Sequence, residues 1–247
     1  MKFKFLDKTL FFPQHGILAV GDLHLGYDYM IQQSGVLIPE RQVEEIIIEL
    51  KNIFNKMKSK KQKLRKIVFI GDLKHSFAYE WKEKNYFNKV LNFLKENLKE
   101  KDIIFIKGNH DTIDYTFDKK LKDYYIEKDI AFLHGDKFFS EVFDSRIKTI
   151  VIGHIHPSII LSDKQGIKEE IFKCFLVGKF KGKEIIILPS FLSTIEGSPI
   201  NNYSEEYEDC FSIMQKKDLM NFTVHTIGDN KIYKFEKIKK LIKNKII

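Results

Sequence analysis

The stretch that decides the fold is ILAVGDLH, residues 17–24, in which four apolar residues lead directly into Gly21, Asp22 and His24. An unbroken apolar run with β-branched residues is typical of a strand that is buried on both faces. The arrangement recurs, with apolar runs at 67–70, 103–106, 130–133 and 149–152 that each end at a polar cluster. The sequence therefore predicts five buried strands that each present polar side chains at one end.

Two helices are predicted between the first three of these strands. Residues 39–57 have apolar side chains at helical spacing, with Pro39 near the start, and residues 79–98 repeat the pattern with Trp81 and Phe87 on one side. Strands joined by such helices run parallel, and right-handed crossovers bring their C-terminal ends to one rim of the sheet. We therefore expect an α/β fold in which the polar clusters converge in space.

Beyond His156 the pattern changes to shorter β-like runs at 159–161, 171–177, 184–188, 222–227 and 231–235, which favour a second sheet. Residues 190–209 are rich in Ser, Asn and acidic residues, so we expect a long surface loop near the strand ends. A basic helix is predicted at about 235–247. It could suit a membrane, nucleic acid or partner helix, but we expect it to dock on its own domain. We expect residues 1–247 to form one domain.

The composition excludes several classes of protein. Hydrophobic residues make up 43% and charged residues 31%, which is ordinary for a folded chain. Asp7 and Lys8 interrupt the N-terminal apolar stretch, and no apolar run reaches the ~18 residues of a membrane span, so we expect no membrane span and a cytoplasmic location. Cys174 and Cys210 lack the paired spacing of a zinc or redox site. The net charge of +8 would favour phosphate-bearing partners.

The chemistry lies in the five polar clusters, GDLH (21–24), GDLKH (71–75), GNHD (108–111), HGD (134–136) and GHIH (153–156), which hold six of the eight histidines. Carboxylate and imidazole ligands without thiolate suit Mn, Fe, Co, Ni or Zn, and Mn is our first expectation. Two such ions about 3.5–4 Å apart can clamp a phosphate ester and activate water. The alternative is a set of ordinary strand-end turns, but recurrence after every buried strand favours a catalytic rim.

In this order, the clusters resemble the calcineurin-like metallophosphoesterases, whose pattern is D-x-H, G-D, G-N-H-[DE], H and G-H-x-H. The resemblance spans residues 22–156. Residues 22–26 and 71–76 most resemble the SbcD-related phosphoesterases, including a small archaeal branch. The resemblance implies two mixed β-sheets packed as a sandwich with flanking helices, and two divalent metal ions at one edge. It also implies seven ligands: Asp22, His24 and His156 for one ion, Asn109, His134 and His154 for the other, and Asp72 as the bridge.

The resemblance further implies a catalytic histidine that binds no metal. His110 holds that position, and we expect it to stabilise developing charge or to protonate the leaving oxygen, with Asp111 orienting it. His75 stands where the nucleases of the family, rather than its phosphatases, have a histidine. It could position a nucleotide, or it could form a local hydrogen bond at a helix start.

These features predict a dinuclear-metal-dependent phosphodiesterase that acts on nucleic acid or nucleotides. The alternatives are a small-molecule phosphomonoesterase or phosphodiesterase, and a non-catalytic scaffold, although a scaffold that had lost its metals should lack ligands. The basic run at 56–66 could touch a phosphate backbone, but such a run is more often a solvated helix end.

Overall fold

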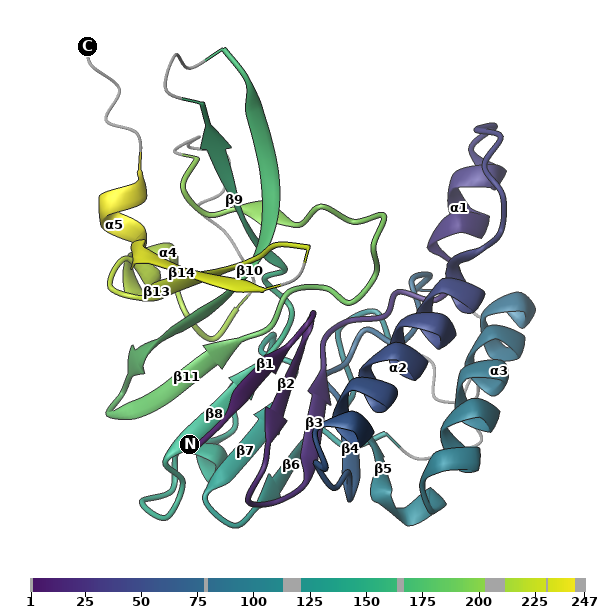
Figure 1. The fold of residues 1–247 in the computed structure, drawn as a ribbon, viewed down its shortest axis with the longest axis horizontal. Coiled ribbons are helices and arrows are strands. Elements are labelled where there is room, and N and C mark those ends of the chain that lie inside the picture. The colour runs from purple at the N-terminus through teal and green to yellow at the C-terminus, as the bar shows by residue number, and fades with distance from the viewer. Residues whose placement is uncertain are drawn as a thin grey trace.

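The computed structural model describes residues 2–77, 80–112, 121–163, 167–202, 212–229 and 231–242, and Figure 1 shows two β-sheets with helices beside them. The first sheet has the order β1 (Lys4–Leu6), β2 (Thr9–Phe12), β3 (Ile17–Val20), β4 (Lys66–Phe69) and β5 (Ile103–Phe105). Strands β3, β4 and β5 are parallel, whereas β1 and β2 add an antiparallel edge. This sheet is therefore mixed, with its parallel strands at the predicted positions.

The second sheet is also mixed. It has the order β12 (Ser198–Pro199), β9 (Pro157–Ser162), β10 (Glu169–Phe180), β11 (Lys183–Ile187), β8 (Thr149–Ile152), β7 (Ile130–Leu133) and β6 (Tyr124–Glu127), with β13 (Thr223–Ile227) on β10 and β14 (Ile232–Lys237) on β13. Strands β11, β8 and β7 run parallel, so β7 and β8 end at the same edge. The predicted fold of two mixed sheets is confirmed.

Two long helices, α2 (Gln42–Ser59) and α3 (Trp81–Asn97), pack against the first sheet. The other described helical elements are α1 (Tyr27–Gln33), η1 (Glu100–Asp102), η3 (Ser140–Phe143), α4 (Lys216–Leu219) and α5 (Ile238–Leu241). Strand β3 explains the layering, because Leu18 and Val20 join the core beneath α2 and α3 while Ile17 and Ala19 join the core between the sheets. Burial of both faces is why the run lacks polar alternation.

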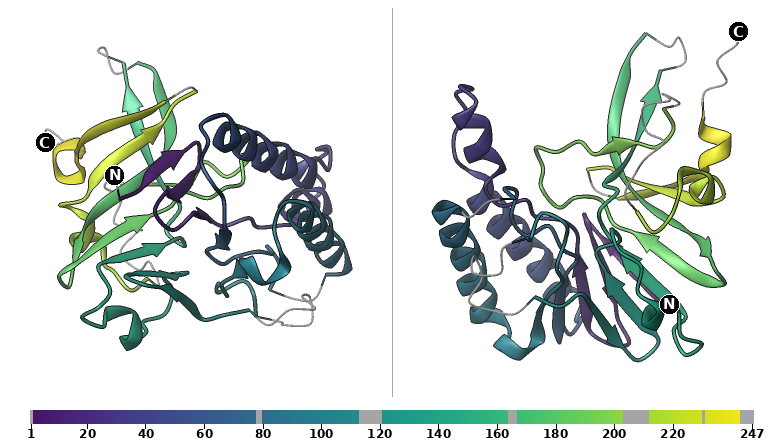
Figure 2. Two further views of the ribbon diagram at one scale, coloured as in Figure 1. Left: turned by 60° about the horizontal axis from the view of Figure 1, so that its bottom comes forward. Right: turned by 180° about the vertical axis from the view of Figure 1, so that it is seen from behind.

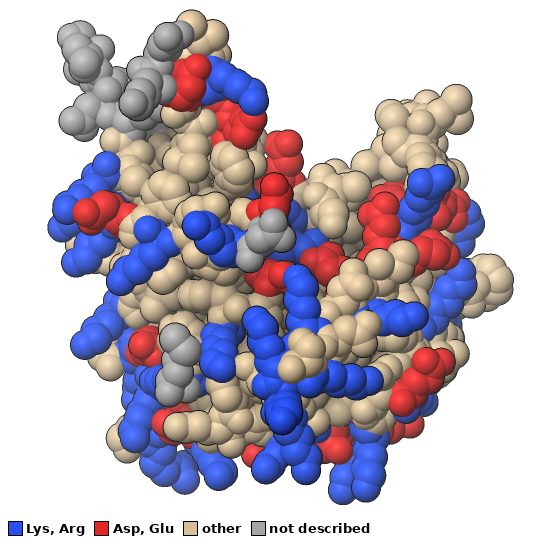
Figure 3. Space-filling view, viewed as in Figure 1, with Lys and Arg blue, Asp and Glu red and all other residues tan. Residues whose placement is uncertain are grey.

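Two projections flank the ends of the parallel strands. Helix α1 begins three residues after His24, and β9 begins directly after His156. Both extend to the same side of the molecule, as Figures 1 and 2 show, and Figure 3 shows the surface hollowed between them. The strand ends therefore lie at the base of a notch with a wall on each side.

The structure differs from the predicted C-terminal helix at 235–247. Phe235 belongs to β14, and helix α5 covers only Ile238–Leu241 before the chain passes into residues 243–247, which lie outside the described part. Ile238 is fully buried against the outer face of the second sheet, so the start of the helix docks on the domain. Of the loop predicted at 190–209, residues 203–209 also lie outside the described part, and Ser198–Pro199 form β12.

The basic run at 56–66 lies away from the notch. It covers the end of α2 and the turn into β4, whereas Asp72 follows the opposite end of β4. Lys56 pairs with Asp7 at 2.8 Å, and Lys66 pairs with Glu127. The run is thus a solvated helix end on the far edge of the sheet. Among the described residues, no helix is long and apolar enough to cross a membrane.

Candidate metal centre

The five polar clusters meet at the base of the notch, and the first two are bound directly to each other. The backbone N–H groups of Leu23 and His24 donate to the carbonyl oxygen of Asp72 at 3.1 and 2.8 Å, and the N–H of Leu25 donates to Leu73 at 2.9 Å. The loops after β3 and β4 therefore continue the parallel pairing of their strands, which fixes the side chains of both clusters on one rim.

Three groups of donor atoms that could hold a metal ion form at this rim, each spanning no more than 4.8 Å: His24 with Asp72 and His156, Asp72 with His134 and His154, and His24 with His75 and His110. The Nε2 atoms of His24 and His156 are 3.3 Å apart, and His154 Nδ1 is 3.0 Å from His134 Nε2. Ligands bonded at about 2.1 Å to one ion, at angles of about 90–110°, are themselves about 3.0–3.4 Å apart. The two histidine pairs therefore each have the spacing of ligands to one ion. Asp72 belongs to the first two groups, with its Oδ2 3.8 Å from His24 Nε2 and 3.4 Å from His134 Nε2.

Asp22 and Asn109 complete the predicted set. Asp22 Oδ2 lies 3.3 Å from His156 Nε2, and Asn109 Oδ1 lies 3.0 Å from His134 Nε2. The structure thus brings together all seven positions predicted as ligands, with Asp22 beside the first group and Asn109 beside the second.

Burial sets the charge of this cluster. Asp22 and Asp72 are 0% and 2% exposed, and an unpaired carboxylate at such depth is costly. Burial raises the pKa of Asp22, but the charge of His156 and the hydrogen bonds from His134 and His156 outweigh it and leave the pKa well below its usual value. Burial and the charge of His156 lower the pKa of His24 to about 3. Asp22 is therefore ionised and His24 neutral, the states in which both can bind a cation.

The pKa of His134 shows most directly that the buried carboxylates favour a positive charge beside them. Burial lowers its pKa, but hydrogen bonds to Asp22 and Asp72 outweigh this effect and raise the pKa well above the usual value. Its Nδ1 donates to the backbone carbonyl of Ile70 at 2.8 Å, which orients Nε2 toward the donor groups. A carbonyl partner on the second ring nitrogen is a common feature of metal-binding histidines.

The backbone is strained at four predicted ligands. His24, Asp72, His154 and His156 have φ values of 45°, 43°, 65° and 47°, in the left-handed region that residues other than glycine rarely adopt. Strain of this kind costs about 1–3 kcal/mol per residue and clusters at functional sites. The fold thus turns these side chains inward at the expense of stability.

Two glycines of the motifs make room for ligands of other motifs. A Cβ on Gly108 would lie 2.1 Å from Asp72 Oδ1, and a Cβ on Gly153 would lie 2.6 Å from Asp22 Oδ2. Neither distance is compatible with a side chain. The motifs therefore need glycine because the carboxylates pack directly on its backbone.

Asp111 does not orient the His110 ring as predicted. Its carboxylate accepts the backbone N–H groups of Leu73, Lys74 and Gly108 at 2.9–3.2 Å, and burial raises its pKa to about 7. The ring of His110 instead donates from Nδ1 to the backbone carbonyl of His75 at 2.6 Å. Asp111 thus acts on His110 indirectly, by holding the loop that carries that carbonyl.

His75 lies within the site, half-buried, with its ring centroid 5.4 Å from that of His24 and 5.5 Å from that of His110. Sequence reasoning missed the residue that holds this loop, Glu83. Its Oε1 accepts the backbone N–H groups of His75 and Ser76 at 3.2 and 2.7 Å. It is only 2% exposed, in the first turn of α3. Glutamate in a helix is ordinary in sequence, so no pattern could have singled it out.

Sequence reasoning also missed Phe77. Its ring stacks on His110 with centroids 4.2 Å apart and an angle of 26°, yet its side chain is 56% exposed.

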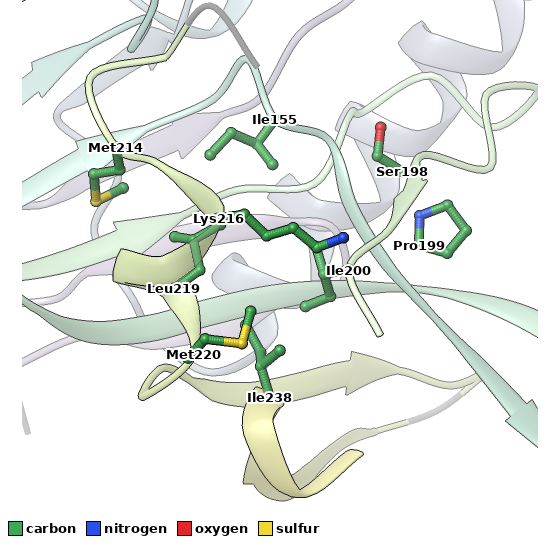
Figure 4. Close-up of a pocket in the computed structure, with 9 residues that line it drawn as sticks. All are labelled: Ile155, Ser198, Pro199, Ile200, Met214, Lys216, Leu219, Met220 and Ile238. Carbon is green, nitrogen blue, oxygen red and sulfur yellow. The ribbon is translucent and has the colours of Figure 1, made fainter. Parts of the chain in front are cut away.

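A separate apolar pocket lies behind the fifth cluster (Figure 4). Ile155, between His154 and His156, lines it together with Met214, Leu219 and other residues of the outer layer, and its volume is about 40 Å³. No predicted ligand lines the pocket, and this volume is far below that of pockets for organic ligands. This pocket is therefore not a candidate substrate site.

The chain was compared with known proteins. No protein of curated function matches it. Similar solved structures include the nuclease MPE of Pseudomonas putida, with a TM-score of 0.59 and 17% identity over 93% of this chain and 92% of that one. A predicted phosphoesterase of Streptococcus pneumoniae has a TM-score of 0.35 and 12% identity over 90% and 97% of the chains. Zinc-bound Vps29 of Entamoeba histolytica has a TM-score of 0.36 and 11% identity over 89% and 96%.

At these identities the Pseudomonas structure supports the fold alone. The sequence itself gives the family, because residues 15–170, more than half of the chain, match the model of the calcineurin-like phosphoesterases. That match covers all five clusters, and the donor groups around Asp72 could hold metal ions. The chain therefore belongs to the calcineurin-like phosphoesterase family and is a metal-dependent phosphoesterase.

Proposed function

We propose that this protein is a phosphodiesterase that uses two divalent ions, with manganese first among them, to hydrolyse nucleic acid or nucleotides. The observation that carries the proposal is the pair of donor groups that share Asp72, because a bridging carboxylate holds two ions at the separation that phosphoryl transfer requires. Bound ions would polarise the phosphate ester and lower the pKa of water.

The predicted ligands divide between the ions as the donor groups do. Asp22, His24 and His156 would hold one ion, and Asn109, His134 and His154 the other. The donors include no thiolate, which favours manganese, iron, cobalt, nickel or zinc over a soft ion.

His110 is the residue that we assign to proton transfer. Its backbone N–H donates to Asp72 Oδ1 at 2.9 Å, which ties it to the bridging ligand, and its Nδ1 is engaged by His75. The ring nitrogen that remains for the substrate is therefore Nε2. When the ring is protonated, Nε2 can stabilise the charge that develops on the phosphoryl group and donate a proton to the leaving oxygen.

A nucleotide substrate is supported by three features. The ring of His75 contacts those of His24 and His110. A histidine at this position of the second motif is a feature in which the chain resembles the nucleases of the family. The net charge of +8 favours polyanions. The Pseudomonas protein with the same fold is described as a nuclease. These features, with the SbcD-like motifs at 22–26 and 71–76, favour nucleic acid over a small phosphate ester. Small-molecule ester hydrolysis is the alternative.

Two further expectations stay predictions, the cytoplasmic location and the organisation of residues 1–247 as one domain. The non-catalytic scaffold is disfavoured because every predicted ligand position is filled by a residue that can bind metal.

The test compares a bis-aryl phosphodiester, an aryl phosphomonoester, and single- and double-stranded DNA, each with manganese and with chelator. We expect manganese-dependent turnover of the diesters and DNA that exceeds turnover of the monoester. Turnover of the monoester alone would overturn the diesterase proposal, and diester turnover without DNA cleavage would leave the small-molecule alternative.

A further inference from the structure

Phe77 is an exposed aromatic ring at the edge of the site, next to His110. It follows the second cluster and leaves 56% of its side chain exposed. Among the described residues, most phenylalanines are wholly or partly buried, including Phe69, Phe132 and Phe175, and Phe138 is the only other exposed one. A single exposed apolar residue is common, but this ring stacks on His110, the residue assigned to proton transfer, and so stands where a substrate would bind.

The position of Phe77 is fixed from two sides. One face of its ring stacks on His110, and the hydroxyl of Thr112 donates to its backbone carbonyl at 2.7 Å. His75 in turn stacks on His110 with an angle of 28°. The three rings form a ladder from His75 through His110 to Phe77. Phe77, at the outer end of this ladder, is the solvent-exposed ring.

We propose that Phe77 is a stacking platform for the base of an unpaired nucleotide whose phosphodiester lies at the metal centre. The inference rests on the proposed phosphodiesterase function and specifies its substrate as single-stranded nucleic acid. Every nucleobase has an aromatic face, so such a platform binds without reading sequence, and proteins that bind single strands commonly use aromatic side chains in this way.

The geometry favours an unpaired base over a duplex. A base inside a duplex is covered above and below by its neighbours and cannot present a face to Phe77, whereas a base in a single strand or at a frayed end can. The ladder also connects base and reaction centre, because His110 lies between Phe77 and the metal ligand His24, whose ring centroid is 5.1 Å from that of His110.

A purely structural role of Phe77 would give a different dependence of activity on the substrate. If Phe77 only covered one face of His110, its loss would impair every substrate equally, with or without a base. The stacking role instead predicts that the loss depends on the base.

The experiment measures kcat/KM with manganese for oligo(dT) and for a strand of the same length made entirely of abasic sites. Wild-type protein is expected to prefer oligo(dT) by about 5- to 150-fold, the range expected for one stacked base. Phe77→Ala should lose this preference by slowing on oligo(dT) alone. Phe77→Leu, which keeps the bulk over His110 but not the aromatic face, should behave in the same way, and Phe77→Trp should restore the preference.

Phe138→Ala is the matched control. Phe138 is also exposed, at 51%, but its ring lies 4.4 Å from Lys181, at the turn that begins β11 on the edge opposite the metal centre. This variant should keep the wild-type preference.

An equal loss on both strands in Phe77→Ala, or an unchanged preference, would overturn the platform while leaving the phosphodiesterase function standing. Wild-type protein that cleaves neither strand but hydrolyses an aryl ester would instead overturn the nucleic-acid function, and the platform with it.

Discussion

Gly108→Ala tests whether Asp72 bridges the two proposed ions, because the Asp72 carboxylate packs directly on the backbone of Gly108. The added Cβ would lie 2.1 Å from Asp72 Oδ1 and 2.3 Å from its backbone nitrogen, whereas real Cβ atoms essentially never approach closer than 3.0 Å. The carboxylate must therefore recede by about 0.9 Å, and rotation of the side chain cannot relieve the backbone contact. Metal–ligand distances tolerate only about 0.2 Å. Asp72 could then no longer hold two ions.

The expected loss is large. We predict that manganese affinity falls at least about 100-fold, the upper end of what loss of an outer partner of a ligand costs, and that overpacking lowers the free energy of unfolding by about 1–3 kcal/mol. Calorimetric titration with manganese and urea denaturation in chelator measure the two effects separately.

Gly182→Ala is the control for the substitution itself. Gly182 has a φ of 78° and nothing within 4 Å of its virtual Cβ, so alanine there should cost about 1–2 kcal/mol of backbone strain and leave metal binding unchanged. If Gly108→Ala bound two ions with wild-type affinity, the close packing of Asp72 on Gly108 could not be what positions the bridge.

Three further predictions concern the surrounding side chains. His110→Ala should keep the metal content measured by mass spectrometry but lower turnover by about 10²- to 10⁴-fold; near-normal turnover would remove His110 from the mechanism. His75→Ala should reduce cleavage of single-stranded DNA roughly 10-fold more than hydrolysis of a bis-aryl diester; an equal reduction would leave His75 without a nucleotide role. Burial raises the pKa of Glu83 from 4.5 to about 7. The folded state then binds its proton more tightly than the unfolded state, and stability falls as pH rises from about 4.5 to 7. The free energy of unfolding, measured with urea in chelator, should fall between pH 5 and pH 8, and Glu83→Gln should reduce that fall by roughly 1–2 kcal/mol after solvent screening. An unchanged fall would contradict the burial of the Glu83 carboxylate.

The strands that carry the site could be predicted because burial on both faces marks a sequence clearly. All five apolar runs are strands with bounds within one residue of those expected, namely β3, β4, β5, β7 and β8. Convergence of the clusters then followed from parallel pairing. Helix α1 was not predicted, because an exposed projection such as Tyr27–Gln33 buries no apolar face and so shows no periodicity.

The side chains that support the site could not be predicted, because they bind backbone rather than other side chains. Asp111 and Glu83 accept main-chain N–H groups of the loop after β4, and any residue can supply such a group. Gly108 looks like a turn residue in sequence, and only the packed structure shows Asp72 against it. The basic residues after Phe235 suggested a longer helix, but pairing with β13 continues through Lys237.

The most direct test of the central claim is anomalous diffraction at the manganese edge from crystals grown with manganese. Two peaks about 3.5–4 Å apart are expected, with the Asp72 carboxylate bound to both. One peak, no peak, or two peaks with Asp72 bound to only one of them would contradict a dinuclear centre bridged by Asp72.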